Sequence, residues 1–360
     1  MFKLKCDDFL IRDEETGKYY MSAEQQVRDE TEKNKWKTTG FTLLKDWRLY
    51  LMLVPMILVY VLWKYLPMYE LTAAFKFGVQ ESASERDWVG IWSFYSIFAG
   101  AKKATFWMAF RNTFVLAFYG LLFGFPMPVI LALFFNEVKS NVARSIMQVC
   151  VYLPKFISTV IVTSLTLTLF RGSAGNSEIG IVSKFLLLIS GSDTLHVRGS
   201  STAGLVYSSE YFRAIYIVTD IWEHAGYDSI VFFAAVIAVS PTSYEAAQID
   251  GAGKMAQMRY VVIPSILSTV IIMLIMKIGG LLNVGYEKLY ILCPSADYGN
   301  YNVAEVVSTW SNRLTEAEGL AKISNQAYGI AAEMTNNLIG MILVIGSNTI
   351  ASKVSDVSLY

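Results

Sequence analysis

Two groups of polar residues stand out in this sequence because they lie in or beside long apolar stretches. The first group falls within residues 212–239 and consists of Asp220, Glu223, His224 and Asp228. A charged side chain is costly in the middle of a bilayer, so we expect this part of the stretch to face protein or a water-filled cavity. The second group is a polar segment that follows directly.

Residue types and spacings typical of catalytic or metal sites are scarce. The run Gly-Ala-Gly-Lys at residues 251–254 looks phosphate-binding, but a phosphate-binding loop needs a glycine in place of Gln248 and a Ser or Thr in place of Met255. We therefore expect no cofactor on this chain. His196 and His224 share no metal-ligand spacing, so no metal site is expected either.

The sequence lacks the residues that two other functional classes would require. An intramembrane enzyme would need paired carboxylates, a histidine-rich cluster or a nucleophile elbow, none of which the sequence offers. A secondary transporter driven by an ion gradient is the alternative; it would need coupling charges at mid-bilayer, whereas here the charges lie near the ends of the apolar stretches. Cys6, Cys150 and Cys293 match no zinc spacing and are expected to be buried small hydrophobes.

Composition predicts the fold class. The 360 residues are 54% hydrophobic and 17% charged, against about 25% charged in a typical soluble domain. The apolar residues form six charge-poor blocks, each long enough to cross a core of roughly 30 Å as a helix. We predict an all-α membrane protein with spans at residues 47–66, 106–135, 145–170, 212–239, 264–283 and 328–350. Zero net charge leaves no global basic field to hold nucleic acid.

The remaining segments are expected to extend or connect these spans. Residues 1–46 are highly charged, lack the apolar region of a signal peptide, and are predicted to be a cytoplasmic extension of a domain at residues 47–360. An even number of spans puts both termini on one side, and the basic residues favour the cytoplasm. Gly120 and Gly124 have the spacing that lets two membrane helices approach closely, and Pro126 predicts a break.

The polar segment at residues 240–264 predicts a short helix outside the bilayer. Pro241 suits a first helical position, and Thr242 with Glu245 has the spacing of a capping box. Asp250 and Lys254 are spaced to pair at i, i+4 along this helix. Its small residues would leave a shallow face that another protein can approach closely.

This segment resembles the EAA loop of binding-protein-dependent ABC importer permeases. The resemblance is carried by Glu245, Ala246, Ala247, Gly251, Val261, Ile263 and Pro264. It implies a type I importer permease fold in which the loop lies in a cleft of an ATPase subunit. Carried over, Glu245 contacts a basic group of the ATPase, Ala246 and Ala247 pack in the cleft, and Gly251 permits the turn. Asp250 is also counted among the residues of this coupling loop.

Further motifs are similar to the LplB-like branch of carbohydrate permeases. They include Leu62-Trp-Lys-Tyr-Leu-Pro, Arg111-Asn-Thr-Phe, Tyr152-Leu-Pro and Leu282-Asn-Val-Gly-Tyr, whereas residues 1–46 and 193–203 fall outside the pattern. The resemblance implies oligosaccharide import in the plasma membrane of a bacterium. It also implies a second permease as heterodimer partner, two ATP-binding subunits that carry ATP and Mg, and an extracellular solute-binding lipoprotein. A permease for a non-sugar solute is the closer alternative.

Candidate residues of the transport path combine aromatic faces with hydrogen-bonding groups, as a sugar would need. They are Trp222, Glu223, His224, Tyr227, Asn283 and Tyr286. Interfacial aromatic belts and polar contacts between helices are the alternative explanation of the same residues. The binding protein is expected to dock on the long outer segments after the third and fifth spans.

Overall fold

The computed structural model describes residues 10–12, 19–21, 47–77, 87–172, 179–190, 204–316 and 320–354. Most of residues 1–46 and all of residues 193–203, whose roles the sequence left open, lie outside these ranges.

The chain divides into two compact units, Met1–Glu70 and Leu71–Tyr360. In the first unit β1 (Leu10–Arg12) pairs antiparallel with β2 (Tyr19–Met21). Helix α2 (Trp47–Tyr60) follows and continues through a π-helical segment, η2 (Val61–Tyr65), into the 3-10 helix η3 (Leu66–Phe75), whose last residues belong to the second unit.

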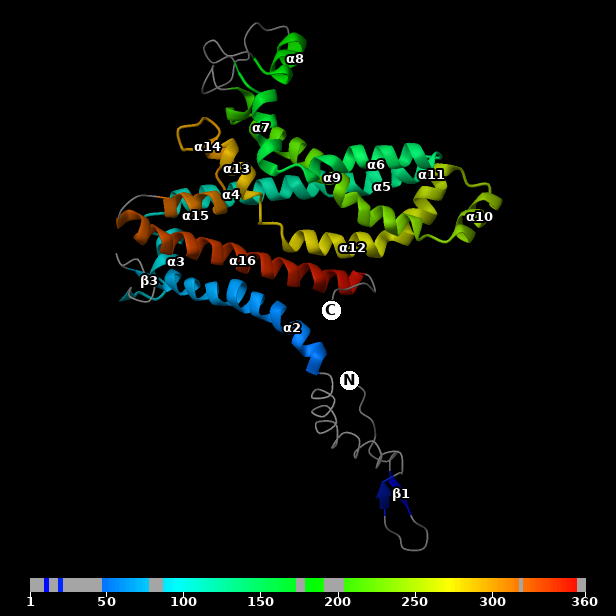
Figure 1. Ribbon diagram of the computed structural model, residues 1–360, viewed down its shortest axis with the longest axis horizontal. Helices are drawn as coiled ribbons and strands as arrows, with labels where there is room; N and C mark the ends of the chain where they lie inside the picture. The colour runs from blue at the N-terminus through cyan, green and yellow to red at the C-terminus, as the bar shows by residue number, and fades with distance from the viewer. Residues whose placement is uncertain are drawn as a thin grey trace. The chain divides into compact units, whose positions relative to one another are not determined.

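The second unit is a bundle of long helices with short elements at its ends. Its elements are β3 (Lys76–Phe77), β4 (Asp87–Trp88), α3 (Trp92–Phe98), α4 (Lys103–Tyr119), η5 (Gly120–Gly124), α5 (Pro126–Glu137), α6 (Asn141–Phe156), α7 (Thr159–Leu169), α8 (Ile181–Ser190), η6 (Leu205–Tyr207), α9 (Phe212–Ile237), α10 (Pro241–Ile249), α11 (Lys254–Gln257), η7 (Met258–Val262), α12 (Ile263–Gly279), α13 (Tyr286–Leu292), α14 (Tyr301–Ala304), α15 (Val307–Glu316) and α16 (Leu320–Val354). Within this unit α10 and α11 lie at one end of the long helices, and α15 and β3 lie at the other (Figure 1). We call these the α10 end and the α15 end.

Helix length and composition fit the predicted number of membrane spans. Among the described residues four helical segments are long and apolar enough to cross a membrane, or six if each of two bent helix pairs is one span. The four segments are Trp47–Phe75, Lys103–Glu137, Lys254–Gly279 and Asn325–Lys353. The bent pairs are α6 with α7, at 96°, and α9 with α10, at 67°.

The third predicted span is therefore not one straight helix. Helix α6 ends at Phe156, and Ser158 begins α7 as an N-cap whose hydroxyl accepts a hydrogen bond from the Val160 amide. Pro154 lies in the last turn of α6 and removes one helical amide donor. The apolar block at residues 145–170 predicted its membrane location but not this bend, because a helix cap needs only one serine.

Prolines also mark three π-helical segments. Pro67, Pro126 and Pro264 each stand two positions after the last residue of η2, η5 and η7, respectively. A proline inside a helix lacks an amide donor, and its ring clashes with the carbonyl four residues earlier. A π-helical turn relieves this clash because its hydrogen bonds span five residues, as from the Ile263 amide to the Met258 carbonyl. The expected break at Pro126 is thus wrong, since the helical segment continues through it, whereas α12 begins at Ile263, one residue before the expected span start at Pro264.

The close helix approach also lies elsewhere than the glycine spacing predicted. A Cβ atom at Gly120 would meet nothing within 4 Å, and one at Gly124 would lie 3.9 Å from the Ile221 side chain. At Gly226 of α9, however, a Cβ would lie 2.1 Å from the Val151 carbonyl oxygen of α6. The close contact between α6 and α9 therefore depends on Gly226.

Three apolar clusters hold this unit together. At the α15 end one cluster joins α9 to α13 and α14 through residues such as Phe212 and Leu289. A second cluster joins α4, α15 and α16 around Phe106 and Trp310. The third cluster, around Ile266, lies where α5, α9, α10 and α12 meet. The ends of α9 are therefore each packed into a separate core.

Replacing Gly226 by alanine should destabilise the protein, because its methyl group would push α6 away from α9. Overpacking of this kind costs about 1–3 kcal/mol, and the unfolding temperature in detergent should fall. Gly120→Ala is the matched control: it has free space around it and alanine is the better helix former, so its unfolding temperature should stay the same or rise. Equal unfolding temperatures for the two variants would contradict the close contact.

Candidate functional site: cavities along α9 and the α10 loop

Three cavities adjoin one another along α9. Their volumes are about 640, 380 and 230 Å³. The first, near the start of α9, shares Ile217 and Ile221 with the second. The second shares Asp228 and Lys277, among others, with the third. We call them the first, second and third α9 cavities, and together they follow α9 from the α15 end toward the α10 end.

The first cavity has one strongly polar side and one apolar side. It is lined by Tyr119, Phe123, Met127, Ser209, Glu210, Arg213, Ala214, Ile217, Val218 and Ile221. Among these residues Arg213 is held by Asn112 of α4, whose Oδ1 accepts a hydrogen bond from the guanidinium over 3.2 Å. The cavity therefore lies between η5 and its flanking helices on one side and α9 on the other.

The second cavity adjoins a buried group of charges. Its lining includes Asp220, His224 and Asn283. Beside it the ammonium of Lys288, from α13, lies 3.5 Å from Glu223 Oε2 and 3.8 Å from Asp220 Oδ1. Lys288 is 2% exposed and Glu223 is 1% exposed. A buried charge without a partner costs several kcal/mol, so these side chains depend on one another.

Two further groups complete this charge cluster. The Thr159 hydroxyl, at the start of α7, donates to Glu223 Oε1 over 2.8 Å. His224 Nδ1 lies 3.5 Å from Asp220 Oδ1, one helical turn earlier. Three elements, α7, α9 and α13, are thus joined at one point, and the bend before α7 is what brings Thr159 there.

The same cluster has the geometry of a possible metal site, which the spacing of histidines alone did not reveal. Asp220, Glu223 and His224 each offer a ligand atom, and these atoms lie within 4.8 Å of one another. The Lys288 ammonium, however, already lies against both carboxylates. Its positive charge supplies the compensation that a metal cation would otherwise give, so we interpret the cluster as an ion-pair network.

The third cavity is mainly apolar, with one ion pair at its border. Lys277 Nζ lies 4.0 Å from Asp228 Oδ2, joining α12 to α9. The other lining residues are Gly124, Phe125, Pro128, Phe232, Met273 and Met276. Both charged side chains also line the second cavity, so the polar lining ends at this pair.

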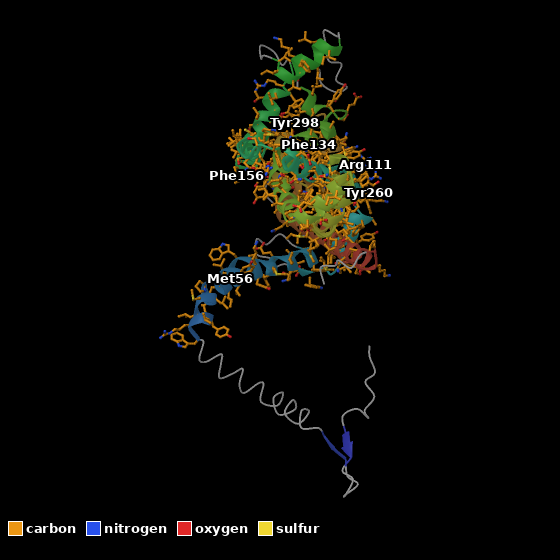
Figure 2. All side chains as sticks on the ribbon, turned by 90° about the vertical axis from the view of Figure 1, so that its right-hand side faces the viewer. Met56, Arg111, Phe134, Phe156, Tyr260 and Tyr298 are labelled. Atoms are coloured by element: carbon orange, nitrogen blue, oxygen red, sulfur yellow. The ribbon has the colours of Figure 1, made fainter. Side chains whose placement is uncertain are left out.

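The predicted path residues are only partly brought together. His224 and Asn283 line the second cavity, and Glu223 is buried beside it in the ion-pair network. Trp222 and Tyr227 are exposed, and Tyr227 packs edge-on against Phe156 at 6.1 Å. Figure 2 shows Phe156 and Arg111 on opposite sides of this unit.

Tyr286, the last of the predicted path residues, contacts Asn312 and Tyr290 at the α15 end. Arg213, Asp220 and Lys277 line the cavities but were not among the candidates. The i, i+4 spacing of Asp220, His224 and Asp228 was the available sequence signal for one polar face of α9.

A second buried ion pair stabilises the α15 end. Arg313 Nε of α15 lies 3.1 Å from Glu305 Oε2, and the same guanidinium donates to the Pro294 carbonyl over 2.7 Å. Burial raises the pKa of Glu305 to about 7, and the charge of Arg313 opposes this rise.

Cys293 is buried here, whereas Cys150 is exposed, contrary to the expectation of buried cysteines.

The α10 loop has a well-defined start and end. Ser240 is the N-cap and Pro241 occupies the first turn, as expected. The predicted capping box is wrong: Thr242 lies inside the helix and its hydroxyl pairs with the Ser240 hydroxyl at 2.7 Å. At the other end Gly251 has φ +75°, and the amides of Gly251 and Ala252 donate to the carbonyls of Gln248 and Ala247. This is a Schellman motif, which requires glycine at the left-handed position.

The loop is attached to the bundle by one aromatic residue and one ion pair. Tyr244 packs against the cluster around Val236, Val262 and Ile266. Lys254 pairs with Glu137 at the end of α5 rather than with Asp250, as the helical spacing had predicted. The reason is the turn at Gly251, which ends the helix before the i, i+4 spacing can apply.

The residues of the EAA pattern lie mostly at the surface of this loop. Glu245, Ala246 and Asp250 are exposed, and Ala247 is half-buried. Ile263 and Pro264 are exposed at the start of α12. Two large apolar side chains beside them are unusually exposed, Ile249 at 86% and Met255 at 74%. The loop therefore presents a mixed charged and apolar surface.

Long apolar helices with polar cavities between them define a multi-pass membrane protein that could conduct a polar solute. Comparison with known proteins supports the assignment as a membrane transport protein. Residues 124–285 match the model of a protein family described as "Binding-protein-dependent transport system inner membrane component". LplB of Bacillus subtilis (strain 168) is 33% identical over 319 residues, which are 88% of this chain and 92% of LplB.

Two further proteins are similar over nearly the whole chain. The polygalacturonan/rhamnogalacturonan transport system permease protein YteP of Bacillus subtilis (strain 168) is 32% identical over 333 residues, 91% of this chain and 95% of YteP. A chain in the crystal structure of a bacterial alginate ABC transporter, in complex with an alginate pentasaccharide-bound periplasmic protein, is 33% identical with a TM-score of 0.73. That match covers 91% of this chain and 100% of the other.

The chain belongs to the family of binding-protein-dependent transport system inner membrane components, the permease subunits of ABC importers. Its fold is the type I ABC importer permease fold, as the resemblance implied. The predicted all-α, membrane-spanning architecture is confirmed, with the bends and continuous helices described above as corrections.

Replacing Lys288 by methionine should destabilise the protein by about 3–5 kcal/mol, because Glu223 would remain buried without its cation. The double variant Lys288→Met with Glu223→Gln should recover most of this loss, since no unpaired charge remains between the two positions. Thermal unfolding in detergent measures both variants, with Lys184→Met of the exposed helix α8 as a control. Additive losses in the double variant would rule out the pairing.

Proposed function

We propose that this chain is one permease subunit of an ATP-driven importer that carries an oligosaccharide, and that the α9 cavities form its half of the transport path. The observation that supports this most directly is the row of cavities along α9, whose polar lining extends from Arg213 to the pair of Asp228 and Lys277. The names of YteP and of the alginate transporter support a saccharide as cargo.

The proposed orientation places the α10 end in the cytoplasm of a bacterial cell, with both chain termini and residues 1–46 on that side. Residues 47–360 then form the membrane domain. The α15 end, with its ion pair between Arg313 and Glu305, faces the outside. A solute-binding lipoprotein docks there, on the long segments after the third and fifth spans. A periplasmic protein bound to the alginate transporter supports this arrangement.

Energy for transport comes from partner subunits. Two ATPase subunits bind ATP and Mg, and this chain itself hydrolyses nothing. A second permease subunit supplies the other wall of the path. Glu245 contacts a basic group of the ATPase, Ala246 and Ala247 pack in its cleft, and Asp250 and Gly251 lie at the turn. Ile249 and Met255 gain an apolar partner there, which accounts for their exposure.

The attachment of α10 explains how ATPase closure is transmitted. Tyr244 ties α10 to the core between α5, α9 and α12, and Lys254 ties the loop to Glu137 of α5. Ile263 and Pro264 begin α12, which lines the third cavity through Met273 and Met276. A displacement of α10 therefore acts on all the helices that surround the second and third cavities.

The variant Glu245→Arg should abolish most cargo-stimulated ATP hydrolysis, because it puts a positive charge against the basic group of the ATPase. We expect at least a tenfold loss of transport in proteoliposomes that contain the complete importer, with the folded permease recovered in normal amount. Asp87→Arg is the matched control, since Asp87 is exposed in β4, outside both the α10 loop and the two segments on which the binding protein docks. Unchanged hydrolysis in Glu245→Arg would overturn the coupling role, and uptake that needs no ATPase would overturn the proposed function.

A further inference from the structure

Two arginines, one in the lining of the first α9 cavity and one beside it, face a single carboxylate. Arg213 lines this cavity, and Arg111 of α4 is close enough to interact with it electrostatically. None of the ion pairs found among the described residues includes either arginine. In the other two cavities the situation differs, because Lys288 and Lys277 each lie against a carboxylate. Glu210 is the single acidic residue in the lining and balances Arg213, so the positive charge of Arg111 beside them is left in excess.

Arg213 is held in a fixed position by a network that reaches the α15 end. The Asn112 side chain is fully buried, and its Nδ2 donates to the carbonyls of Asn302 and Glu305 at 2.9 and 3.0 Å. With both amide protons used, Oδ1 of Asn112 must accept, and Arg213 Nη2 donates to it. Within the described part of the chain this is the single hydrogen bond of the Arg213 side chain, so most of its donors remain available to a ligand.

The rest of the lining fits a saccharide. Tyr119 and Phe123 present aromatic rings, on which the apolar face of a sugar ring can pack. Guanidinium groups bind carboxylates in a bidentate geometry that hydroxyl groups alone cannot satisfy. Because this cavity adjoins the second through Ile217 and Ile221, a ligand held here lies on the proposed transport path.

We propose that Arg213, with Arg111 beside it, recognises a carboxylate of the cargo, and that the cargo is therefore an acidic oligosaccharide containing uronic acid residues. This inference rests on the proposed function and specifies its substrate class. The two arginines attract the anionic chain to the start of α9, and Asn112 keeps the Arg213 guanidinium oriented toward it. Further along α9, Lys288 and Lys277 are already paired with carboxylates, so the anionic oligosaccharide can pass without being trapped.

Recognition of a cargo carboxylate by Arg213 is tested by measuring uptake by the complete importer. The importer is reconstituted with its binding protein in vesicles of neutral phosphatidylcholine, and uptake of trigalacturonate or trimannuronate is compared with uptake of the methyl ester of the same trisaccharide. The methyl ester keeps the sugar skeleton but has no charge. Binding of each compound to the binding protein is measured separately, and uptake is compared at saturation.

The variant Arg213→Gln should reduce uptake of the acidic trisaccharide by about tenfold or more, the size expected for losing a hydrogen bond to a charged group. Uptake of the methyl ester should change less than twofold. Arg213→Lys should retain part of the uptake because it keeps the charge. Arg48→Gln, which removes an exposed arginine of α2 that does not line the cavity, should behave as wild type.

Several results would overturn the inference. Equal losses for the acid and its ester would indicate a structural role for Arg213. A loss seen only in vesicles containing phosphatidylglycerol, and independent of cargo charge, would assign the arginines to a lipid headgroup. ATP-dependent uptake of the ester without uptake of either acid would overturn the acidic cargo and leave the proposed function standing. ATP-independent uptake would instead overturn the proposed function.

Discussion

The buried ammonium of Lys288, held between Glu223 and Asp220, is the interaction on which the rest of this permease depends. Charges inside an apolar bundle must be compensated locally, because neither lipid nor core side chains can solvate them. This requirement fixes α13 against α9 and, through Thr159, places the start of α7 beside them. It also leaves Asp220 and His224 at the border of the second cavity, where a polar solute can contact them.

The same helix connects this network to the α10 loop. Helix α9 begins in the apolar cluster around Phe212 and ends in the cluster around Ile266, so each end has its own core. Ser240 then starts α10 at 67° to α9, and the Schellman turn at Gly251 returns the chain toward α12. A helix with both ends fixed and polar groups between them is well suited to transmit a displacement of the loop to the cavities.

The sequence predicted what depends on local composition. Six apolar blocks predicted the spans, and the pattern around Glu245 predicted the short helix and its exposure. The sequence could not predict the bend at Ser158. The bend is stabilised by the Ser158 cap and by the hydrogen bond from Thr159 to Glu223, which is distant in the chain. The lysine that neutralises Glu223 is 65 residues away in the chain, and only the packing of α13 on α7 and α9 brings it close. Gly226 was missed for the same reason, because its need for space arises from Val151 of another helix.

We propose that movement of the α10 loop opens and closes the α9 cavities. A single cysteine in place of His224, in a chain whose native Cys6, Cys150 and Cys293 are replaced by serine, reports this directly. A membrane-impermeant maleimide is added on the side of the binding protein, with the complete importer either free of nucleotide or trapped with ATP and vanadate. The account predicts labelling at least about tenfold faster in the trapped state, when the cavity opens outward. Equal labelling rates in the two states would contradict it.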